Sequence, residues 1–385
     1  MLSTTVSDSP AMRVAIFIPS YGDGGVERML VNLAGGLARR GVHVDFLTRS
    51  AQAPYLDRLS KEVRLIETGK TGLWSLQPFL RQYLREARPD FVLCGKDRAG
   101  RTALLAKRLW KADFALIMRP GSTVSERLAK RSWIKRWRAY RLIRKTYQPA
   151  AAVVGNSEGV VRDVAMISGV PDARMHLIRN PVITPDLFER AAQAPRPDCF
   201  GDSAPPVILG VGGLRRQKGF DTLVRAFAHV RAARPCRLLI LGEGHLRASL
   251  TSLAEELGVV DDVLMPGFDP DPYPSVSRAS VFVLSSRWEG SPNALTEALA
   301  LGTPVVSTDC PSGPREVLRG GEVAPLVPVD DVTAMADAID RVLDAPGDRA
   351  MRQAAVNEYT VETCAARYHA LFQSLLDARG RGNGH

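Results

Sequence analysis

Short apolar runs alternate with longer amphipathic stretches along most of the chain. The first run is RVAIFIP at residues 13–19, and others lie at residues 42–47, 91–94, 114–118 and 152–155. Strands covered on both faces of a parallel sheet lose the polar alternation of surface strands, so these runs predict buried parallel strands. Between the first two, Leu30, Leu33 and Leu37 recur at helical spacing before Gly41. This β-α-β order predicts an α/β domain.

The same pattern restarts after an interval that lacks periodicity. Residues 186–206 collect proline and small residues, as an interdomain linker does. Beyond them, apolar runs predict strands at residues 207–212, 237–241, 281–284 and 304–307, and amphipathic stretches predict helices at residues 220–233, 246–257 and 292–301. The second half of the chain is therefore predicted to form a second doubly wound sheet.

We expect an α/β protein with two Rossmann-like, doubly wound domains that face each other across a cleft. A chain of 385 residues fits two domains, since single cores stop growing at about 250–300 residues. The expected parts are a disordered N-terminus at 1–11, an N-terminal acceptor domain at 12–186, a linker at 187–206, a C-terminal donor domain at 207–360, a helix at 361–378 and a disordered tail at 379–385.

Composition excludes several classes of protein. The five cysteines are scattered and form no C-x-x-C pair, which argues against a disulfide framework or a zinc site. The N-terminus lacks the pattern of a signal peptide, and no apolar run approaches the roughly 20 residues that span a bilayer. We therefore expect a cytoplasmic protein. The formal net charge of +10 indicates anionic partners without choosing among nucleic acid, acidic lipid and phosphorylated substrate.

The turn after the first strand of the second domain concentrates positive charge. Residues 212–221 read GGLRRQKGFD, so three cations lie between a buried strand and a helix. The helix dipole disfavours cations at this end unless an anion binds there. Arg215 can bridge two phosphate oxygens and Lys218 can act as a mobile point charge, so both are candidates to bind a diphosphate. A solvated basic loop is the alternative.

Each domain begins with a strand that leads into a glycine-rich turn. In the first domain the turn is GDGG at residues 22–25. Exposed amides in such turns suit a diphosphate, although glycine turns are also ordinary structural punctuation. Neither turn completes the G-x-G-x-x-G pattern, which weakens a nicotinamide dinucleotide interpretation.

Two carboxylates flank the start of the predicted helix at residues 292–301. Ser291 suits the N-cap, Pro292 the first helical position and Gly302 the stop, so Glu289 precedes the helix and Glu297 lies within it. Six helical steps span roughly 9 Å. A nucleotide sugar could then lie with its diphosphate near the helix N-terminus and its hydroxyls near both carboxylates. Carboxylates at this spacing are also common as surface charges.

Segments spread over nearly the whole chain resemble the retaining glycosyltransferases of family four, also called group 1, which have the two-domain GT-B fold. The segments are GGVE at 24–27, GNSE at 155–158, NPV at 180–182, GGLRRQKGFD at 212–221, LGEG at 241–244, GF at 267–268, SSRWEGSPNA at 285–294 and DCPSGPRE at 309–316.

This resemblance implies a donor site without cofactor or metal. Arg215 and Lys218 would hold the donor diphosphate, and with Glu289, which would contact the transferred sugar, they form the expected catalytic set. Glu297 would bind the ribose, and Phe268 would lie near the base. The remaining donor contacts are expected from Gly24, Gly25, Gly290, Ser291, Asn293, Ala294 and Leu295.

The resemblance also implies the reaction. We expect transfer of a hexose or N-acetylhexosamine, with retention, to a lipid-linked or polysaccharide acceptor. Many relatives carry a histidine where this chain has Arg119, so Arg119 is expected to support the acceptor or a phosphate, and no side-chain base is assigned. A nucleotide-sugar epimerase and a non-catalytic nucleotide-sugar-binding protein are the alternatives.

Two other features need an interpretation. A D-x-D at Asp269 and Asp271 resembles a metal motif, but the family has no metal site there. The stretch from Arg127 to Lys145 holds nine cations and no acidic residue, with Trp133 and Trp137 at helical spacing. This pattern is typical of an interfacial helix on an anionic membrane, or of a core aromatic stripe with a solvated basic face. No motif for nucleic acid accompanies it.

Overall fold

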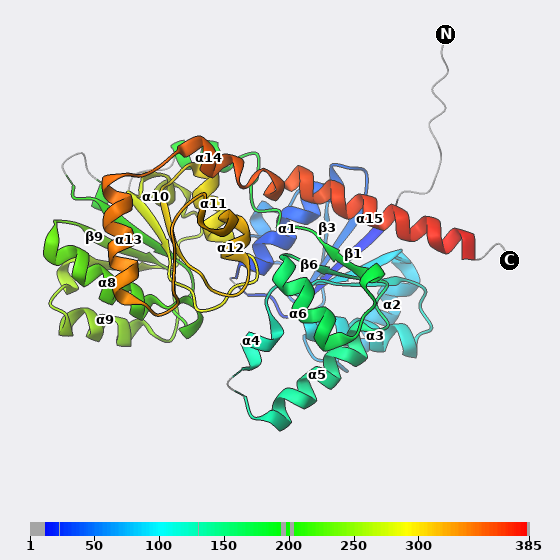
Figure 1. Cartoon of the computed structure of the whole chain (residues 1–385). Coiled ribbons are helices and arrows are strands. Elements are labelled where there is room, and N and C mark those ends of the chain that lie inside the picture. The colour runs from blue at the N-terminus through cyan, green and yellow to red at the C-terminus, as the bar shows by residue number, and fades with distance from the viewer. Residues whose placement is uncertain (1–11, 23, 130, 194–197, 201–203, 383–385) are drawn as a thin grey trace, which may run out of the picture. The chain divides into compact units, whose positions relative to one another are not determined.

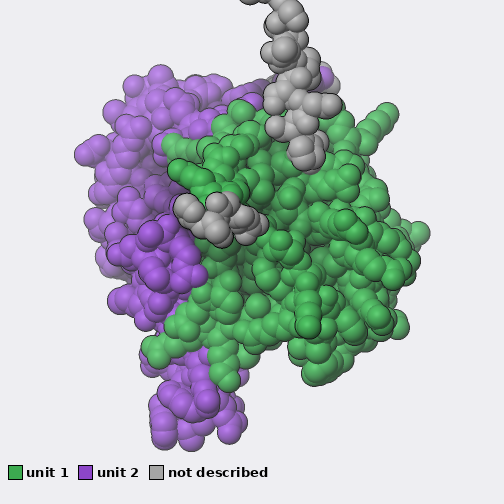
Figure 2. Space-filling model, turned by 90° about the vertical axis from the view of Figure 1, so that its right-hand side faces the viewer, with its two compact units in different colours: residues 1–119, 142–153, 365–385 green, residues 120–141, 154–364 purple. Residues whose placement is uncertain are grey.

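The computed structural model describes residues 12–22, 24–129, 131–193, 198–200 and 204–382 (Figure 1). Its contacts divide the chain into two compact units, shown in Figure 2: unit 1 holds residues 1–119, 142–153 and 365–385, and unit 2 holds residues 120–141 and 154–364. The expected N-terminal segment 1–11 and positions 383–385 of the expected tail lie outside the described residues.

The first sheet has seven strands in the order β3-β2-β1-β4-β5-β6-β7. They are β1 (Arg13–Ile18), β2 (His43–Thr48), β3 (Arg64–Glu67), β4 (Phe91–Cys94), β5 (Ala115–Met118), β6 (Ala152–Gly155) and β7 (Met175–Leu177). All five apolar runs of this half form strands. The sequence missed β3 and β7, whose side chains are largely half-buried, because edge strands need no continuous apolar run.

Helices connect these strands. They are α1 (Gly25–Ala38), α2 (Gln77–Ala87), α3 (Asp97–Leu109), α4 (Val124–Leu128), α5 (Trp133–Tyr147), α6 (Glu158–Ser168) and α7 (Leu187–Gln193). The shorter 3-10 helices of the chain are η1 (Leu56–Arg58), η2 (Asp172–Arg174), η3 (Asp198–Phe200), η4 (Arg216–Lys218), η5 (Val260–Asp262), η6 (Arg319–Gly321) and η7 (Asn357–Tyr359).

The second sheet lies in unit 2 and has six parallel strands in the order β10-β9-β8-β11-β12-β13. They are β8 (Val207–Val211), β9 (Arg237–Leu241), β10 (Val263–Gly267), β11 (Val281–Leu284), β12 (Val305–Thr308) and β13 (Leu326–Val327). The helices are α8 (Phe220–Ala233), α9 (Arg247–Glu256), α10 (Tyr273–Arg278), α11 (Asn293–Leu301), α12 (Gly313–Val317), α13 (Val332–Asp344) and α14 (Arg349–Ala354).

Helices cover both faces of this second sheet (Figure 1). Ile208 belongs to a buried cluster with residues of α8, α9 and α13, whereas its neighbour Leu209 belongs to another with residues of α10 and α11. Successive strand residues point to opposite faces, so a sheet covered on both faces needs an unbroken apolar run. This explains why strands of the second half can be recognised from the sequence.

The strand order reverses beside β8, which pairs with β9 on one side and β11 on the other. In doubly wound sheets, ligands bind at such a switch point, beyond the carboxyl ends of the strands. The turn after β8 and the loop after β11 therefore emerge next to each other. The same reversal occurs in the first sheet, where β1 pairs with β2 and β4.

The last helix, α15 (Val361–Gly382), extends beyond the expected end at residue 378. The predicted disordered tail is therefore wrong for residues 379–382. Within unit 1, Phe372 stacks on Phe91 with ring centroids 4.7 Å apart, and Arg379 donates hydrogen bonds to the Asp113 carboxylate and the Asp90 carbonyl. These contacts hold the final turns in place. No helix among the described residues has the length and apolar character to span a bilayer.

The other domain boundaries expected from the sequence remain predictions. Within the expected linker at 187–206, α7 and η3 are helical. Its residues 194–197 and 201–203 lie outside the described part of the chain.

Candidate functional site

Lys218 and Glu289 meet at the switch point of the second sheet. Lys218 ends η4 in the turn after β8, and Glu289 lies in the loop after β11. The Lys218 Nζ atom lies 2.6 Å from the Glu289 Oε1 atom, and the Glu289 side chain is only 8% exposed. Ser286 Oγ donates a second hydrogen bond of 2.7 Å to the same oxygen. Lys218 and Glu289, which lie 71 residues apart in the sequence, thus form an ion pair.

The loop that carries Glu289 is held by main-chain bonds. The Glu289 amide donates to the Pro311 carbonyl at 2.6 Å, and the Ser312 amide donates to the Glu289 carbonyl at 3.0 Å. Burial, and secondly the charge of Glu289, raises the pKa of the neighbouring Cys310 thiol to about 12. Cys310 is therefore a neutral thiol rather than a nucleophile.

The turn after β8 packs closely on the turn after β9. A Cβ at Gly242 would lie 2.0 Å from the Gly212 carbonyl oxygen, and one at Gly244 would lie 2.3 Å from the Leu214 carbonyl oxygen. The Gly242 amide also donates to the Gly267 carbonyl at 2.8 Å. The LGEG and GF segments therefore constrain the backbone of the turn after β8, which carries the three cations.

Helix α11 begins two residues after Ser291, which corrects the prediction that Ser291 is the N-cap. Pro292 occupies the N-cap with φ −78° and ψ 91°, and no side chain caps this end. Because proline lacks an N–H and has a fixed φ, it forms the extended residue before the helix. Ser291 Oγ is buried without a hydrogen-bond partner among the described residues.

The amide end of α11 lies directly after the Glu289 loop. Thr296 donates the first bond of the helix ladder, to the Pro292 carbonyl, so the amides of Asn293, Ala294 and Leu295 point out of the helix end. In the Asn293 side chain, Oδ1 accepts a 2.7 Å hydrogen bond from Asn180 Nδ2. Gly290 forms an antiparallel bridge with Ser122.

The other donor-site candidates of unit 2 differ in exposure. Arg215 is exposed, and its Nε lies 3.3 Å from a Cβ built on Gly213. Phe268 is 41% exposed and directly follows β10. Glu297 is only 1% exposed, four residues into α11. The structure thus joins Lys218 to Glu289 directly.

In unit 1, the glycine turn after β1 is occupied by a carboxylate of its own helix. Gly24 is the N-cap of α1, which begins at Gly25. Glu27 Oε1 accepts the Gly22 amide at 3.1 Å and lies 2.5 Å from Lys96 Nζ. The Gly22 amide of this turn is therefore already bonded within the chain, while the expected roles of Gly24 and Gly25 stay predictions. The turn also contains residue 23, which lies outside the described residues.

Arg119 follows β5 in unit 1 and is 1% exposed. Its amide donates to the Cys94 carbonyl at 2.9 Å. Burial of a guanidinium costs free energy unless it is paired and hydrogen-bonded, so a buried arginine at this position requires such partners. Its expected role on the acceptor side stays a prediction.

Comparison with protein families adds a decisive observation. The Glycosyltransferase Family 4 model matches residues 23–184, and the model of Glycosyl transferases group 1 matches residues 200–359. The chain belongs to the group 1 glycosyltransferases. The two matches cover the second sheet and all of the first sheet except β1, and the family predicted from the sequence motifs is confirmed.

The relatives of this glycosyltransferase include an N-acetylgalactosaminyltransferase and a lipopolysaccharide core transferase. The chain is 28% identical over 364 residues to the N-acetylgalactosamine-N,N'-diacetylbacillosaminyl-diphospho-undecaprenol 4-alpha-N-acetylgalactosaminyltransferase of Campylobacter jejuni, covering 90% of this chain and 93% of the relative. It is 28% identical over 326 residues to the lipopolysaccharide core biosynthesis glycosyltransferase LpsE of Rhizobium meliloti, covering 83% and 86%.

Solved structures show that the glycosyltransferase has the GT-B fold. Sucrose-phosphate synthase from Thermosynechococcus elongatus superposes with a TM-score of 0.77 at 22% identity, covering 95% of this chain and 100% of that structure. Anabaena HepE in complex with UDP and glucose gives 0.76 at 18% identity, covering 94% and 100%. The predicted α/β class with two parallel-sheet domains is confirmed.

The aspartates of the D-x-D are engaged with neighbours. Asp271 Oδ1 lies 2.7 Å from Arg190 Nη2, and the Asp271 amide donates to Asp269 Oδ1 at 2.8 Å. Within the described residues, no group of three or more histidine, cysteine or acidic side chains could hold a metal ion.

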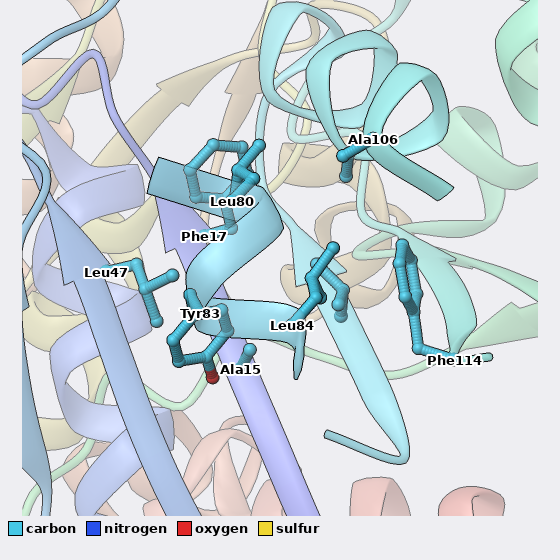
Figure 3. Close-up of a pocket in the computed structure, with 10 residues that line it drawn as sticks. Ala15, Phe17, Leu47, Leu80, Tyr83, Leu84, Ala106 and Phe114 are labelled. Carbon is cyan, nitrogen blue, oxygen red and sulfur yellow. The ribbon is translucent and has the colours of Figure 1, made fainter. Parts of the chain in front are cut away.

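The cavity in Figure 3 lies in the core of unit 1, and none of the candidate site residues lines it. It measures about 10 Å³ and lies beneath α2, where Leu80, Tyr83 and Leu84 approach Ala15 and Phe17 of β1 (Figure 3). Its lining is apolar, so it is a packing void and not a substrate site.

Helix α5 of the glycosyltransferase exposes much of its aromatic surface. Trp133 is 77% exposed and Trp137 is 54% exposed, whereas Ile143 and Tyr147, farther along the helix, are buried. Of the two interpretations of residues Arg127 to Lys145, a core aromatic stripe is therefore wrong for these tryptophans. Lys130, within this stretch, lies outside the described residues.

Sequence reasoning assigned no role to several side chains that shape the site. Ser286 bonds Glu289, Arg287 bonds the β8 turn, and Lys96 bonds Glu27 in unit 1. The sequence feature that could have identified these three residues is their position, because each follows a buried strand at a switch point.

Proposed function

We propose that this glycosyltransferase transfers a hexose or N-acetylhexosamine from a nucleotide diphosphate sugar to a lipid-linked or polysaccharide acceptor, with retention of the anomeric configuration. The acceptor belongs to lipopolysaccharide, capsule or exopolysaccharide synthesis. The names of the Campylobacter and Rhizobium relatives support this choice of product class.

One observation carries the proposal: the ion pair of Lys218 and Glu289 at the switch point, directly before the amide end of α11. A pyrophosphate would find a cation and the N-terminal end of a helix there, and the transferred sugar would find a buried carboxylate. Arg215 would add the fork of a guanidinium, and Glu297 and Phe268 would contact the ribose and the base. Gly24 and Gly25 would add amides.

The chemistry follows from these charges. The bond between the anomeric carbon and the diphosphate oxygen breaks, and the acceptor oxygen bonds to the same carbon on the same face. The acceptor proton passes to the departing phosphate oxygen, which gives a glycoside and a nucleoside diphosphate. Fixed cations and helix amides stabilise the negative charge that develops on the leaving group. No side-chain base is needed, which is consistent with Arg119 at the position where relatives carry histidine.

Two considerations support retention. The Campylobacter relative is named for an alpha linkage. Donors such as UDP-N-acetylgalactosamine carry an alpha diphosphate, so an alpha product from one retains the configuration. Proton NMR of the product formed by this chain, set against the donor, tests this part of the proposal. An inverted anomeric proton coupling would contradict it.

The deciding experiment incubates the purified protein with UDP- and GDP-sugars, with and without lipid-linked acceptors. We expect release of nucleoside diphosphate that depends on acceptor, and weaker donor binding in Lys218→Ala and Glu297→Ala. Unchanged donor binding in both variants would contradict the site. An isomerised sugar without acceptor would indicate an epimerase, and tight binding without turnover would indicate a sensor.

We also propose that the acceptor is reached at an anionic membrane surface through α5, on the inner face of the membrane. Trp133 and Trp137 are exposed, and the Arg141 guanidinium lies over the Trp137 ring, 5.4 Å from its centroid. Such a face binds by aromatic insertion and by attraction to acidic lipids. Flotation with phosphatidylglycerol vesicles should recover the wild type, and Trp133→Ala/Trp137→Ala should reduce recovery. Equal flotation with purely zwitterionic vesicles would contradict the electrostatic part.

A further inference from the structure

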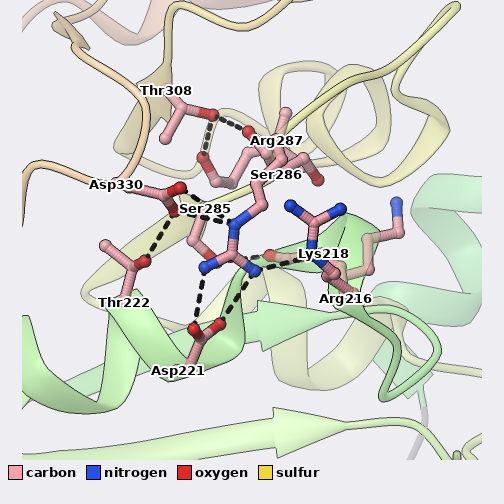
Figure 4. A network of polar contacts seen from close by, with 10 residues as sticks. Arg216, Lys218, Asp221, Thr222, Ser285, Ser286, Arg287, Thr308 and Asp330 are labelled. Atoms are coloured by element: carbon pink, nitrogen blue, oxygen red, sulfur yellow. Dashed lines mark hydrogen bonds and ion pairs between the residues drawn. The ribbon is translucent and has the colours of Figure 1, made fainter. Parts of the chain in front are cut away.

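Arg287 is the most heavily bonded side chain of the loop after β11. Its side chain is 13% exposed and forks onto Asp221, with Nη2–Oδ2 at 2.7 Å and Nη1–Oδ1 at 3.0 Å. Its Nε lies 2.8 Å and 3.1 Å from the two oxygens of Asp330 (Figure 4). Two carboxylates therefore surround one guanidinium.

The same residue holds the turn after β8. Arg287 Nη1 donates to the Arg216 carbonyl at 2.8 Å, and the Arg287 amide donates to the Gln217 carbonyl at 2.7 Å. Ser285 Oγ donates to the next carbonyl, that of Lys218, at 2.8 Å. Three successive carbonyls of η4 are thus bonded by the segment that leads to Glu289.

These contacts leave Arg287 a poor ligand for a phosphate. The bond to Asp221, which exceeds the opposing effect of burial, raises the pKa of Arg287, so the guanidinium stays charged. That charge is already opposed by two carboxylates, and three of its nitrogens are engaged. Lys218, by contrast, has one carboxylate partner and a side chain that is 23% exposed.

We propose that Arg287 is a positioning residue for donor binding, which fixes the Arg216 and Gln217 carbonyls so that Lys218 projects over Glu289. The inference rests on the proposed function, because it names what holds the diphosphate-binding turn. Without the guanidinium the turn would keep the main-chain bond to the Gln217 carbonyl but would lose the side-chain bond to the Arg216 carbonyl.

If Arg287 only stabilised the fold, its loss would lower the free energy of unfolding without a selective effect on phosphate binding. The bonds of Arg287 go to a surface turn and to the edge of α8, while the core beneath α8 consists of apolar residues such as Leu223, Phe227 and Val230. Loss of the guanidinium should therefore change the placement of a phosphate ligand more than the fold. Misplacement of a binding group by about 1 Å can cost roughly 100-fold.

The test measures dissociation constants for UDP, GDP, UMP and GMP by calorimetry. We expect Arg287→Ala to weaken the binding of the preferred diphosphate roughly 10- to 100-fold, and the monophosphate much less, so that the diphosphate preference falls. Arg287→Lys should keep the charge but not the fork, and should recover only part of the preference. Arg231→Ala is the control, because Arg231 pairs with Asp262 at 2.6 Å on the same helix α8 without contacting the turn.

Each outcome decides a different question. Wild-type protein that binds no nucleotide would overturn the proposed function and the inference with it. Wild-type binding with an unchanged diphosphate preference in Arg287→Ala and Arg287→Lys would overturn the inference alone. If Arg287→Ala does not fold, Asp330→Asn, which removes the negative charge beside Nε and keeps one oxygen that can accept from the Thr222 hydroxyl, should show a smaller loss of the same preference, and an unchanged preference there would also overturn the inference.

Discussion

The turns after β1 and β8 occupy the same place in two similar sheets, yet their charges are arranged differently. In unit 1, the carboxylate of Glu27 bonds the turn's own Gly22 amide and pairs with Lys96. In unit 2, the turn supplies the cation, Lys218, and the neighbouring loop supplies the carboxylate, Glu289. Topology provides both positions, and the side chains decide which one presents positive charge.

The comparison teaches that a switch point is a location and not yet a site. Both turns follow the first strand of a sheet whose order reverses there. A glycine-rich turn whose amide is bonded internally is pre-shaped but partly satisfied, whereas a turn with an exposed cation and a nearby open helix end can gain bonds from an anion. We therefore expect the donor diphosphate to depend mainly on unit 2.

The largest expected effect comes from removing, in separate variants, the cation that forms the ion pair at each turn. Lys218→Ala should lower kcat/KM for the donor by roughly 10²- to 10³-fold, because a fixed charge on the leaving group is lost. Lys96→Ala removes a cation whose partner is the protein's own Glu27, so its loss should be about tenfold or less. Steady-state kinetics with varied donor check this order. Equal losses would show that the two turns contribute alike.

The second prediction concerns Gly219, which ends the β8 turn with φ +60°. A Cβ there would lie 2.1 Å from the Ser285 carbonyl oxygen, whereas Gly258, with φ +68°, has nothing within 4 Å of its Cβ position. Replacing either glycine with alanine should destabilise the protein by about 1–2 kcal/mol, because a residue with a Cβ disfavours the left-handed conformation. Gly219→Ala should cost more, because backbone must also move.

Denaturant unfolding of the two alanine variants measures this difference. If Gly258→Ala is as destabilising as Gly219→Ala, the close approach to Ser285 does not constrain the turn. Donor binding gives a second measurement, which should fall only in Gly219→Ala.

Buried strands were the most predictable part of the fold. The runs at 237–241 and 281–284 form β9 and β11 with the expected bounds, because both faces of the sheet demand apolar side chains. Strand β10 was missed, since its residues up to Pro266 are only partly buried. Edge strands satisfy fewer contacts and leave a weaker pattern.

The sequence pattern drew attention to candidate site residues, but it could not predict their contacts. Glycine and cation spacing identified Lys218, and the motif after β11 identified Glu289. The support from Arg287 was not predictable, because its partner Asp221 lies 66 residues away and only the pairing of β8 with β11 brings them together. The N-cap at Ser291 failed because preference scales do not foresee that Pro292 itself stays extended.

A smaller effect is expected from the carboxylate of the unit 1 turn. Glu27→Gln keeps the shape of the side chain and removes the charge that holds Lys96 at 2.5 Å. Because Lys96 is partly exposed, the loss of stability should be about 1–2 kcal/mol, and donor affinity should change by less than about tenfold. Urea unfolding and calorimetry measure both. A loss as large as that of Lys218→Ala would contradict the contrast between the turns.

The smallest effect should appear in the pH dependence of the Arg287 network. Burial raises the pKa of Asp221, but the hydrogen bond and charge of Arg287 outweigh it, so the pKa lies below its ordinary value of 3.8. A depressed carboxyl pKa contributes stability above the unfolded pKa, and this contribution is lost as the pH falls through the folded pKa. Asp221→Asn should therefore be less stable than wild type near neutral pH by under about 1 kcal/mol, since Asp221 is half exposed. The gap should close below about pH 4, and urea midpoints that differ equally at both pH values would show that the ion pair is not its cause.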